Sequence, residues 1–312
     1  MKKLISIAIP AYNEEGNLDE LKKRLQEVMS ANPGYDFEVI ISENGSWDRS
    51  YEILLQINRE DPRFKVVQLS RNFGCDGGIT AAMHHAKGDA LVIMMADLQE
   101  PPEMISEFIK KWEEGYDVVY GKIMKRAESG FMRVLFTKMF YRIMYLLTNK
   151  AFPEDVSDFR LMDRRVYLAV NSMEERNRLL RGLIAWTGFR QYGIPFDRRP
   201  RYAGKSTFNY IAVFKLAFNG IFAFSYFPLK LATVFGTIIS LLAFIAAIIE
   251  VAMNLIFGRE VPGFTTLITV ILLMSGIIIL ILGIIGEYIS RIYDEVKQRP
   301  NYIIRNEIGF QK

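Results

Sequence analysis

The feature that most constrains this chain is a long stretch with almost no charge. Between Leu231 and Gly286 the only charged residues are Glu250, Arg259 and Glu260. An ordinary globular composition would place about thirteen charges there. An apolar segment of about 20 residues is long enough to cross a hydrocarbon core about 30 Å thick. The sequence therefore predicts a water-soluble head joined to a membrane-embedded tail.

The tail divides into two uncharged segments, Leu231–Ile249 and Val261–Gly286. At a helical rise of about 1.5 Å per residue, each is long enough to span a membrane. The connection between them holds one basic residue, whereas several flank the pair: Lys215, Lys230, Arg291, Lys297, Arg299 and Arg305. The positive-inside rule then predicts a transmembrane hairpin over 231–288 in the inner or plasma membrane. The head, both termini and a tail over 289–312 are expected in the cytoplasm.

A third apolar stretch, Phe208–Phe227, carries Lys215 and two asparagines. If it spanned the membrane, only Pro228 to Lys230 would remain for the turn into the next span. We therefore expect interfacial amphipathic helices over 206–230, lying in the headgroup layer of the membrane lipids. Three glycines of the second span would permit close helix packing and hence a homo-oligomer: Gly276, Gly283 and Gly286.

The first part of the chain, up to Tyr120, alternates between short apolar runs and segments of helical period. The expected strands are Leu4–Ile9, Phe37–Ile41, Lys65–Leu69, Ala90–Met95 and Val118–Tyr120. The expected helices are Glu15–Ser30, Ser50–Arg59, Gly78–Ala86 and Pro102–Glu114. This alternation predicts an α/β fold with a parallel sheet and helices on both faces, and a ligand site at the carboxyl ends of the strands.

Composition excludes several classes of protein. A single cysteine, Cys75, excludes an intramolecular disulfide and fits a reducing compartment. The net charge of +4 is too small to indicate nucleic acid as a partner. The sequence has no Gly-x-Gly-x-x-Gly that opens a helix and no phosphate-binding Gly-Lys-Ser/Thr loop. It therefore lacks the motifs that usually indicate hydride transfer or ATP hydrolysis.

Polar loops follow three of the expected strands. They are Pro10–Glu15, Ser42–Asp48 and Ala96–Pro102. Each loop alone is compatible with ordinary helix capping by a residue such as Asn13 or Asp48. Three acidic loops at one edge of the sheet favour a functional site instead.

These loops resemble a known family. Ile9–Leu18, read Ile-Pro-Ala-Tyr-Asn-Glu-Glu-Gly-Asn-Leu, resembles the opening of inverting GT-A glycosyltransferases of family 2. Four further segments are similar to the polyprenyl-phosphate glycosyltransferases in that family, such as dolichol-phosphate mannose synthase and bactoprenol glucosyltransferases: Leu69–Gly74, Ala96–Glu103, Asp155–Arg164 and Gly286–Tyr288. The resemblance implies a Rossmann-like GT-A catalytic head over 1–205, and it adds weight to a homo-oligomer such as a tetramer.

The resemblance also implies a nucleotide-sugar pocket and a divalent cation, Mg²⁺ or Mn²⁺. The pocket would be lined by Pro10, Tyr12, Glu14, Glu43, Asn44 and Asp97. Glu43 retains a carboxylate where the family has an Asp pair, which favours a uracil base and a UDP-sugar. Asp97 and Gln99 match the last two positions of the family's Asp-x-Asp-x-Gln metal motif. Met95 replaces the first Asp, and a thioether is a poor ligand for these cations, so a weakened metal site is expected.

For the acceptor, the resemblance implies Asp158 and Arg160 as catalytic residues. A phosphate monoester is mostly dianionic at pH 7, so Asp158 is expected to orient the acceptor more than to remove a proton. The residues expected to bind the lipid phosphate are Arg160, Arg198, Arg201 and Lys205. Alternatively this basic cluster is a membrane-facing surface for anionic headgroups. The two interpretations are compatible.

The sequence thus favours a membrane enzyme that transfers one sugar from a nucleotide donor to undecaprenyl or another polyprenyl phosphate. The product would be a lipid-linked donor for modifying cell-envelope glycans. One alternative is a processive polysaccharide synthase, although its Gln-x-x-Arg-Trp motif is absent from the sequence. The other is a non-catalytic membrane scaffold whose metal site has decayed at Met95. His84 and His85, which have no partnered nucleophile, are expected to be surface or packing residues.

Overall fold

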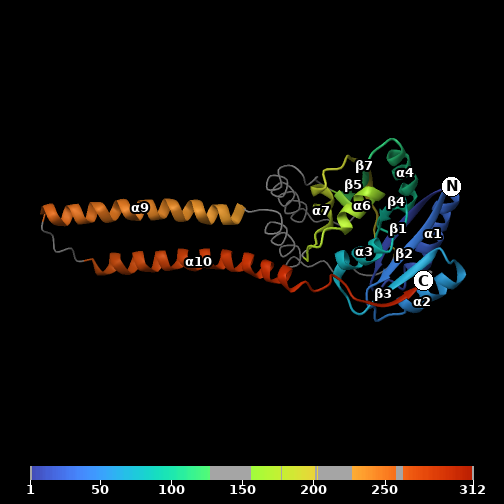
Figure 1. Ribbon diagram of the computed structural model, residues 1–312, viewed down its shortest axis with the longest axis horizontal. Helices are drawn as coiled ribbons and strands as arrows, with labels where there is room; N and C mark the ends of the chain where they lie inside the picture. Colours follow the sequence, from blue (N-terminus) through green and yellow to red (C-terminus); the bar gives the residue numbers. More distant parts are fainter. Residues whose placement is uncertain are drawn as a thin grey trace. The chain divides into compact units, whose positions relative to one another are not determined.

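The computed structural model describes residues 2–126, 156–176, 178–200, 202, 227–257 and 263–310. The described residues form two units (Figure 1), the head and the hairpin. The head comprises the described residues up to 202 together with 299–310, and the hairpin lies between them in the chain. Arg201, Lys205 and most of the expected interfacial segment, up to residue 226, lie outside the described residues.

The head contains a mixed sheet whose described strands are ordered β7-β5-β6-β4-β1-β2-β3-β8. Their bounds are β1 Lys3–Ala11, β2 Tyr35–Glu43, β3 Phe64–Leu69, β4 Ala90–Ile93, β5 Val118–Arg126, β6 Val156–Asp163, β7 Gln191–Arg198 and β8 Ile304–Ile308. The four neighbours β4, β1, β2 and β3 are parallel, as the sequence predicts. The complete sheet is mixed, because two strands that the sequence did not predict are antiparallel to their neighbours: β6, which lies between β4 and β5, and the edge strand β8, which pairs with β3.

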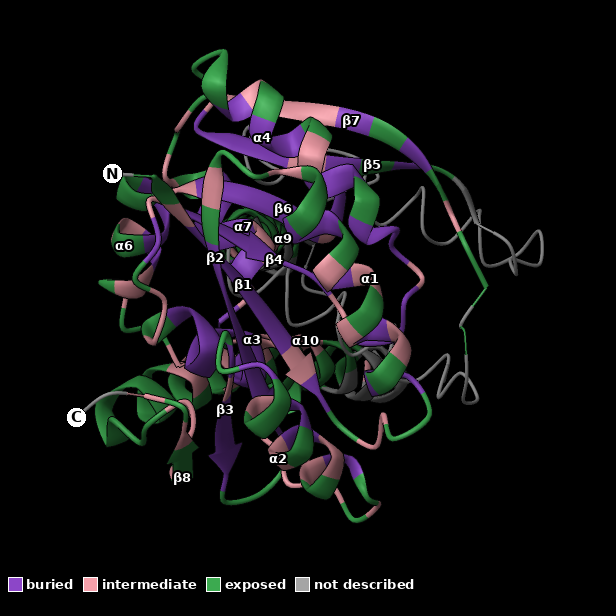
Figure 2. Ribbon diagram, turned by 90° about the vertical axis from the view of Figure 1, so that its right-hand side faces the viewer, coloured by how far each residue is buried: buried purple, intermediate pink, exposed green. Residues whose placement is uncertain are grey.

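Helices cover the sheet, whose strands are largely buried (Figure 2). Those of the head are α1 Leu18–Ala31, α2 Ser50–Glu60, α3 Gly74–His84, α4 Ile105–Glu113 after the short 3₁₀ turn η1 Pro102–Met104, α6 Arg164–Asn171 and α7 Leu180–Trp186. On α1 the leucines Leu18, Leu21 and Leu25 recur at helical spacing and are fully buried against the sheet. Helix α3 begins at Gly74, ahead of the predicted start at Gly78, because the Asn44 side chain fixes the turn that precedes it.

A buried carboxylate ties the central strands together. Glu38 on β2 is 4% exposed and accepts hydrogen bonds from Ser6 Oγ on β1 at 2.6 Å and Lys65 Nζ on β3 at 2.6 Å. The backbone N–H of Lys87, ahead of β4, donates to the same carboxylate at 2.8 Å. Burial alone would raise the pKa of Glu38, but the hydrogen bonds from Lys65 and Ser6 outweigh it and hold the pKa below its ordinary value.

The hairpin consists of α9 Phe227–Phe257 and α10 Phe264–Lys297. Both contain a stretch long and apolar enough to cross a membrane, Leu229–Ala246 and Leu273–Lys297, and neither stretch is buried within the described structure. The predicted spans Leu231–Ile249 and Val261–Gly286 largely coincide with these helices. Two membrane-spanning candidates of this length are what a hairpin requires.

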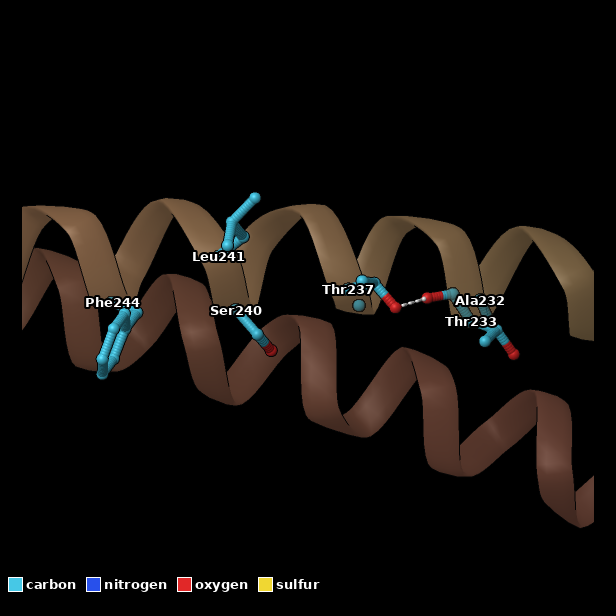
Figure 3. A pocket seen from close by; sticks show the side chains of 7 residues that line it. Ala232, Thr233, Thr237, Ser240, Leu241 and Phe244 are labelled. Atoms are coloured by element: carbon cyan, nitrogen blue, oxygen red, sulfur yellow. Dashed lines mark hydrogen bonds between the residues drawn. The ribbon is translucent and has the colours of Figure 1, made fainter.

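One face of α9 carries small and hydroxyl-bearing side chains (Figure 3). They border a hollow of about 650 Å³ lined by Ala232, Thr233, Gly236, Thr237, Ser240, Leu241 and Phe244. Gly236 faces α10, where a Cβ added to it would lie 3.9 Å from Ile281. A Cβ on Gly276, Gly283 or Gly286 would meet no described atom within 4 Å. The expectation that these three glycines pack between helices, and with it the homo-oligomer, therefore stays a prediction.

Helix α10 ends at Lys297, and Gln298 takes a left-handed conformation with φ 48°. The chain then re-enters the head, where β8 pairs with β3. The segment predicted as a tail over 289–312 thus begins as helix and then contributes an edge strand to the sheet of the head.

We predict that Glu38→Ala destabilises the head by about 3–5 kcal/mol, because it leaves the Lys65 ammonium without its buried partner. The measurement is urea unfolding of the protein in detergent at neutral pH. Because the folded pKa of Glu38 is lowered, its contribution is present above the ordinary glutamate pKa of about 4.3 and is lost as the pH falls through the folded pKa. The difference between wild type and Glu38→Ala should therefore shrink in acid.

The matched control is Glu60→Ala on α2, which removes an exposed partner of Lys22. Exposed ion pairs contribute little to stability, so this variant should unfold at the wild-type urea concentration. Equal destabilisation by the two variants would contradict the role assigned to Glu38.

Candidate active site

The loops after β1 and β2 are joined by hydrogen bonds from backbone N–H groups to side-chain oxygens. The Asn13 N–H donates to Ser46 Oγ at 3.0 Å, and the Trp47 N–H donates to the Asn13 side chain at 3.1 Å. The Glu14 N–H donates to Ser50 Oγ at 2.8 Å. Asn13 has a φ of 55°, a left-handed conformation that asparagine tolerates better than most residues. The serines and Asn13 therefore fix the loop that presents three of the predicted site residues, Pro10, Tyr12 and Glu14.

Glu43, at the end of β2, is 1% exposed, and only one of its two carboxylate oxygens has a hydrogen-bond partner among the described atoms. Its Oε1 accepts a hydrogen bond from the Ser46 N–H, whereas its Oε2 has no partner among the described atoms. A buried carboxylate oxygen without a donor is costly, so such an atom calls for a ligand that supplies an N–H or O–H. Tyr12 is 40% exposed and offers a ring for stacking at the end of β1.

Asn44 connects three loops. Its N–H donates to Ala11 O at 2.9 Å, after β1. Its side chain accepts from the Phe73 N–H at 2.9 Å and donates to Gly74 O at 2.8 Å, in the loop after β3. Asn44 is 2% exposed, so this amide is bound to protein on both sides. The structure therefore gives Asn44 the role of a scaffold for the loops around Glu43.

The loop after β4 holds Asp97 and Gln99. The Gln99 N–H donates to Asp97 Oδ1 at 3.2 Å, and the Gln99 side-chain amide donates to Arg199 O at 3.2 Å. The segment after β7 supports the same loop, since the Tyr202 N–H donates to Asp97 O at 3.4 Å. Gln99 directs its N–H₂ to protein, which leaves its amide oxygen to act as a ligand beside the Asp97 carboxylate.

Next to them lies Glu100, a buried carboxylate that sequence reasoning did not single out. It is 1% exposed and accepts a hydrogen bond from Ser157 Oγ on β6. Burial, together with the charges of Asp158 and Asp97, raises the pKa of Glu100 to about 7, although Ser157 and Arg198 act to lower it. Glu100 is therefore only partly ionised at neutral pH, beside the carboxylates of Asp97 and Asp158.

Asp158 lies on β6 in a two-point ion pair with Arg181 from α7. Arg181 Nε donates to Asp158 Oδ1 at 2.5 Å, and Arg181 Nη2 donates to Oδ2. Burial alone would raise the pKa of Asp158, but Arg181, Arg160 and Arg198 outweigh it and hold the pKa below its ordinary value. Asp158 is therefore ionised at neutral pH.

Sequence reasoning missed Arg181. It lies 23 residues beyond Asp158 on the short helix α7, which the periodicity did not reveal. The one available signal was its place among basic residues in Arg176–Arg181, a run that a solvated surface would show equally well.

Two other predicted basic residues are described. Arg160 is 2% exposed, and its guanidinium donates to Ser157 O at 2.7 Å and Asp158 O at 3.3 Å. Burial lowers the pKa of Arg160 to about 10, so it stays charged. Arg198 ends β7, and its Nε is buried without a hydrogen-bond partner in the described structure. Both place positive charge beside Asp158.

Cys75 and Asp76, at the start of α3, face the same region. Cys75 Sγ lies 3.8 Å from Met95 Sδ, so the residue that replaces the family's first metal-site Asp contacts a thiol. The Asp76 carboxylate accepts a hydrogen bond from the Leu180 N–H, the residue before Arg181. Burial, followed by the charge of Asp158, raises the pKa of Asp76 to about 6.

In the described part of the chain no three His, Cys, Asp or Glu side chains are grouped to hold a metal ion. Asp97 and Gln99 supply two hard oxygen donors instead. Magnesium is commonly bound by one or two carboxylates together with phosphate oxygens of the substrate. The donor set therefore fits a cation that is shared with a bound diphosphate.

Comparison with known proteins gives a consistent result. Residues 6–170 match the model of glycosyl transferase family 2, and residues 227–292 match the GtrB C-terminal hairpin. The chain is 43% identical to the uncharacterised glycosyltransferase YkcC of Bacillus subtilis over 98% of its length and 94% of that protein. It is 34% identical to the bactoprenol glucosyl transferase of Shigella phage SfV, over 97% of this chain and 98% of that protein. Among solved structures, the glucosyl-3-phosphoglycerate synthase of Mycobacterium tuberculosis is 15% identical, with a TM-score of 0.48 over 70% of this chain and 78% of that one.

Gly45, directly after Asn44, lies at a tightly packed contact between these loops. Its φ is +71°, and an added Cβ would lie 2.8 Å from the backbone of Arg71. We predict that Gly45→Ala destabilises the head by about 2–4 kcal/mol, since left-handed strain and a clash with backbone add up. Gly188→Ala is the matched control, because Gly188 has the same φ of +71° and no neighbour within 4 Å. Urea unfolding should show a clearly smaller loss for Gly188→Ala, and equal losses would refute the packing argument.

Proposed function

The chain belongs to glycosyl transferase family 2, and we propose that it transfers a single sugar from a UDP-sugar to a polyprenyl phosphate such as undecaprenyl phosphate. Relatives named for bactoprenol as acceptor are similar over nearly their whole length, including the hairpin. In the structure, the observation that carries the proposal is the ionised Asp158 surrounded by Arg181, Arg160 and Arg198. A site of this kind is suited to positioning a dianionic phosphate as the attacking group.

The donor site in this proposal lies on the loops after β1, β2 and β4. The free oxygen of Glu43 would accept the imide N–H of a uracil base, and Tyr12 would stack on the ring. Pro10, Glu14 and Asn44 complete the nucleotide pocket. Uracil carries an N–H at ring position N3, where cytosine carries an unprotonated nitrogen, so a carboxylate facing this position favours uracil over cytosine.

Asp97 and Gln99 would hold a divalent cation together with the diphosphate of the donor. The cation supplies charge neutralisation for the diphosphate that leaves from the sugar. The thioether of Met95 adds no hard donor, so Asp97 carries the only carboxylate of this pair. Asp97 also receives the Gln99 N–H, which orients its carboxylate.

In the transfer step, an oxygen of the lipid phosphate attacks C1 of the sugar on the face opposite the leaving diphosphate. The new bond joins C1 to the phosphate oxygen, the bond from C1 to the diphosphate breaks, and the configuration at C1 inverts. The dianionic acceptor needs no base to remove a proton. Asp158, fixed by Arg181, would orient the acceptor, and Arg160 and Arg198, with Arg201 and Lys205 outside the described residues, would attract its phosphate.

The hairpin would anchor this chemistry at the cytoplasmic face of the membrane. By the positive-inside rule, its basic flanks support a cytoplasmic location for both ends of the hairpin. The same basic residues, with Arg198, Arg201 and Lys205, are suited to anionic headgroups as well as to the acceptor. The lipid-linked sugar would then serve as a donor for cell-envelope glycans.

We predict metal-dependent transfer of labelled sugar from a UDP-sugar to undecaprenyl phosphate by the purified protein in detergent. A panel of UDP- and GDP-sugars is assayed by extraction of label into the organic phase, with Mg²⁺, Mn²⁺ or EDTA. Asp97→Ala and EDTA should each lower the rate at least about 100-fold, since the charge on the leaving diphosphate is then uncompensated. Transfer at an unchanged rate in EDTA would contradict the metal site, and no transfer from any donor by folded protein would favour the scaffold alternative.

We predict that Arg181→Ala lowers kcat by about 10- to 100-fold, because Asp158 loses the partner that fixes its orientation. Arg181→Lys should retain part of the activity, since an ammonium keeps the charge but not the two-point geometry. Steady-state kinetics with both substrates varied provides the measurement. Arg59→Ala on the exposed face of α2 is the control and should behave as wild type. If Arg181→Ala retained the wild-type kcat, the pair would have no part in the transfer step.

A further inference from the structure

The segment that re-enters the head after α10, residues 299–310, is called here the return segment. It lies beside β3 and the loop that follows β3. Its strand β8 pairs with β3, and Asn306 Nδ2 donates to Gln68 Oε1 at 2.6 Å. At the end of β3 the Ser70 N–H donates to Ile303 O at 2.9 Å. The return segment therefore contacts the first residue of the loop that leads to α3.

The return segment also packs against both ends of α3. At the C-terminal end, His84 Nδ1 and Tyr302 Oη are 2.7 Å apart, and His85 Nε2 lies 3.1 Å from Glu307. The prediction that both histidines are packing residues is confirmed by these contacts. Burial, followed by the charge of Arg178, lowers the pKa of His84, so its ring is neutral at pH 7 and its bond to Tyr302 is a neutral one.

At the N-terminal end of α3, the close contact involves Gly77. A Cβ added there would lie 2.8 Å from Phe73 Cβ and 3.3 Å from the backbone oxygen of Asn301. Asn301 therefore lies against the first turn of α3, the turn that contains Cys75 and Asp76. Only a glycine allows the return segment, the loop and this turn to approach so closely.

The loop over 70–76, a name used here for the residues after β3 together with the first residues of α3, is thus held from two sides. On one side the return segment contacts Ser70 and Gly77. On the other side Asn44 binds Phe73 and Gly74, and Gly45 packs against Arg71. A displacement of the loop would break the hydrogen bonds that keep Asn44, and therefore the neighbouring Glu43, in place.

We propose that residues 301–303 of the return segment are positioning residues for the donor site, which they hold in its binding geometry through the loop over 70–76. This inference rests on the proposed function for the identity of the ligand. Tyr302 fixes the segment to α3, Ile303 fixes it to Ser70, and Asn301 supports the turn that carries Asp76. The nucleotide pocket, which is built by loops from the first third of the chain, is therefore completed by residues close to the C-terminal end.

The test uses the full-length protein in detergent with two variants, Tyr302→Phe and Gly77→Ala. Tyr302→Phe removes one neutral hydrogen bond and keeps the ring. It should raise KM and the calorimetric Kd for the UDP-sugar about 2- to 10-fold while kcat stays near wild type. Gly77→Ala, which pushes Asn301 and Phe73 apart, should have the larger effect. Amide hydrogen exchange over 70–76 should be faster in both variants.

Two controls match these changes. Tyr293→Phe alters an exposed tyrosine of α10, and Gly34→Ala adds a Cβ that meets nothing within 4 Å. Both should leave KM and exchange unchanged. Variants that lower the melting temperature but keep the wild-type exchange over 70–76 and the wild-type KM would overturn the inference, since the return segment would then be only structural.

The exchange measurement needs no donor, so it separates this inference from the proposed function. If wild type transfers no sugar, the proposed function fails, yet unchanged exchange over 70–76 in Tyr302→Phe and Gly77→Ala still refutes the positioning role. If wild type is active, unchanged donor affinity in the two variants refutes it independently.

Discussion

The buried amide of Asn44 is the interaction on which the donor side of the head depends. Through one backbone and two side-chain hydrogen bonds it connects the ends of β1, β2 and β3. These strands are parallel, so their carboxyl ends meet at one edge, but adjacency alone does not fix the loops that follow. The side-chain amide of Asn44, which is 2% exposed and has partners on both sides, does fix them. Breaking either of its hydrogen bonds would leave a buried polar group unsatisfied. The orientation of Glu43, the residue before Asn44, therefore depends on these hydrogen bonds.

The acceptor side depends on charge in a different way. Four arginines, Arg160, Arg178, Arg181 and Arg198, lie around carboxylates that are themselves partly buried. Removing a charge from water is costly unless partners compensate, and here the compensation is unequal. Asp158 forms an ion pair with Arg181 and stays ionised, whereas the pKa values of Glu100 and Asp76 are raised. One carboxylate is thus kept fully ionised, whereas its neighbours change their charge close to neutral pH.

Much of the fold was predictable because β1 to β4 are apolar runs buried on both faces. The run Val118–Tyr120 also predicted the start of β5, but β6, β7 and β8 were not predicted, and β6 illustrates why. It reads Val-Ser-Asp-Phe-Arg-Leu-Met-Asp, with Asp158 and Arg160 facing a polar site inside the sheet, so its composition gives no clean strand signal. The exposed strand β8 is defined by pairing with β3, which lies in the first quarter of the chain. Long-range pairing of this kind leaves little trace in local sequence.

The residues of the site also divide into those that local sequence motifs reveal and those that only the folded chain brings together. Glu43, Asn44, Asp97 and Asp158 stand in motifs, and a motif is local. Arg181 acts across 23 residues from a helix too short to show a period, so only the folded chain brings it to Asp158. Glu100 was visible in the sequence as one more loop carboxylate. Its significance comes from complete burial beside Asp97 and Asp158, and burial of a charged residue is not readable from composition.

Because the chain returns to the head after α10, the hairpin is flanked on both sides by sequence that belongs to the head. Topologically it is an insertion within one catalytic domain, comparable to an extended surface loop, and not an appendage at the end of that domain. The chain on both sides of the insertion belongs to the same folded body. A soluble head cannot be made by cutting the chain before α9, because that cut removes β8 and leaves the hydrogen-bonding edge of β3 open to other chains. It requires an internal deletion that rejoins the head to residue 299.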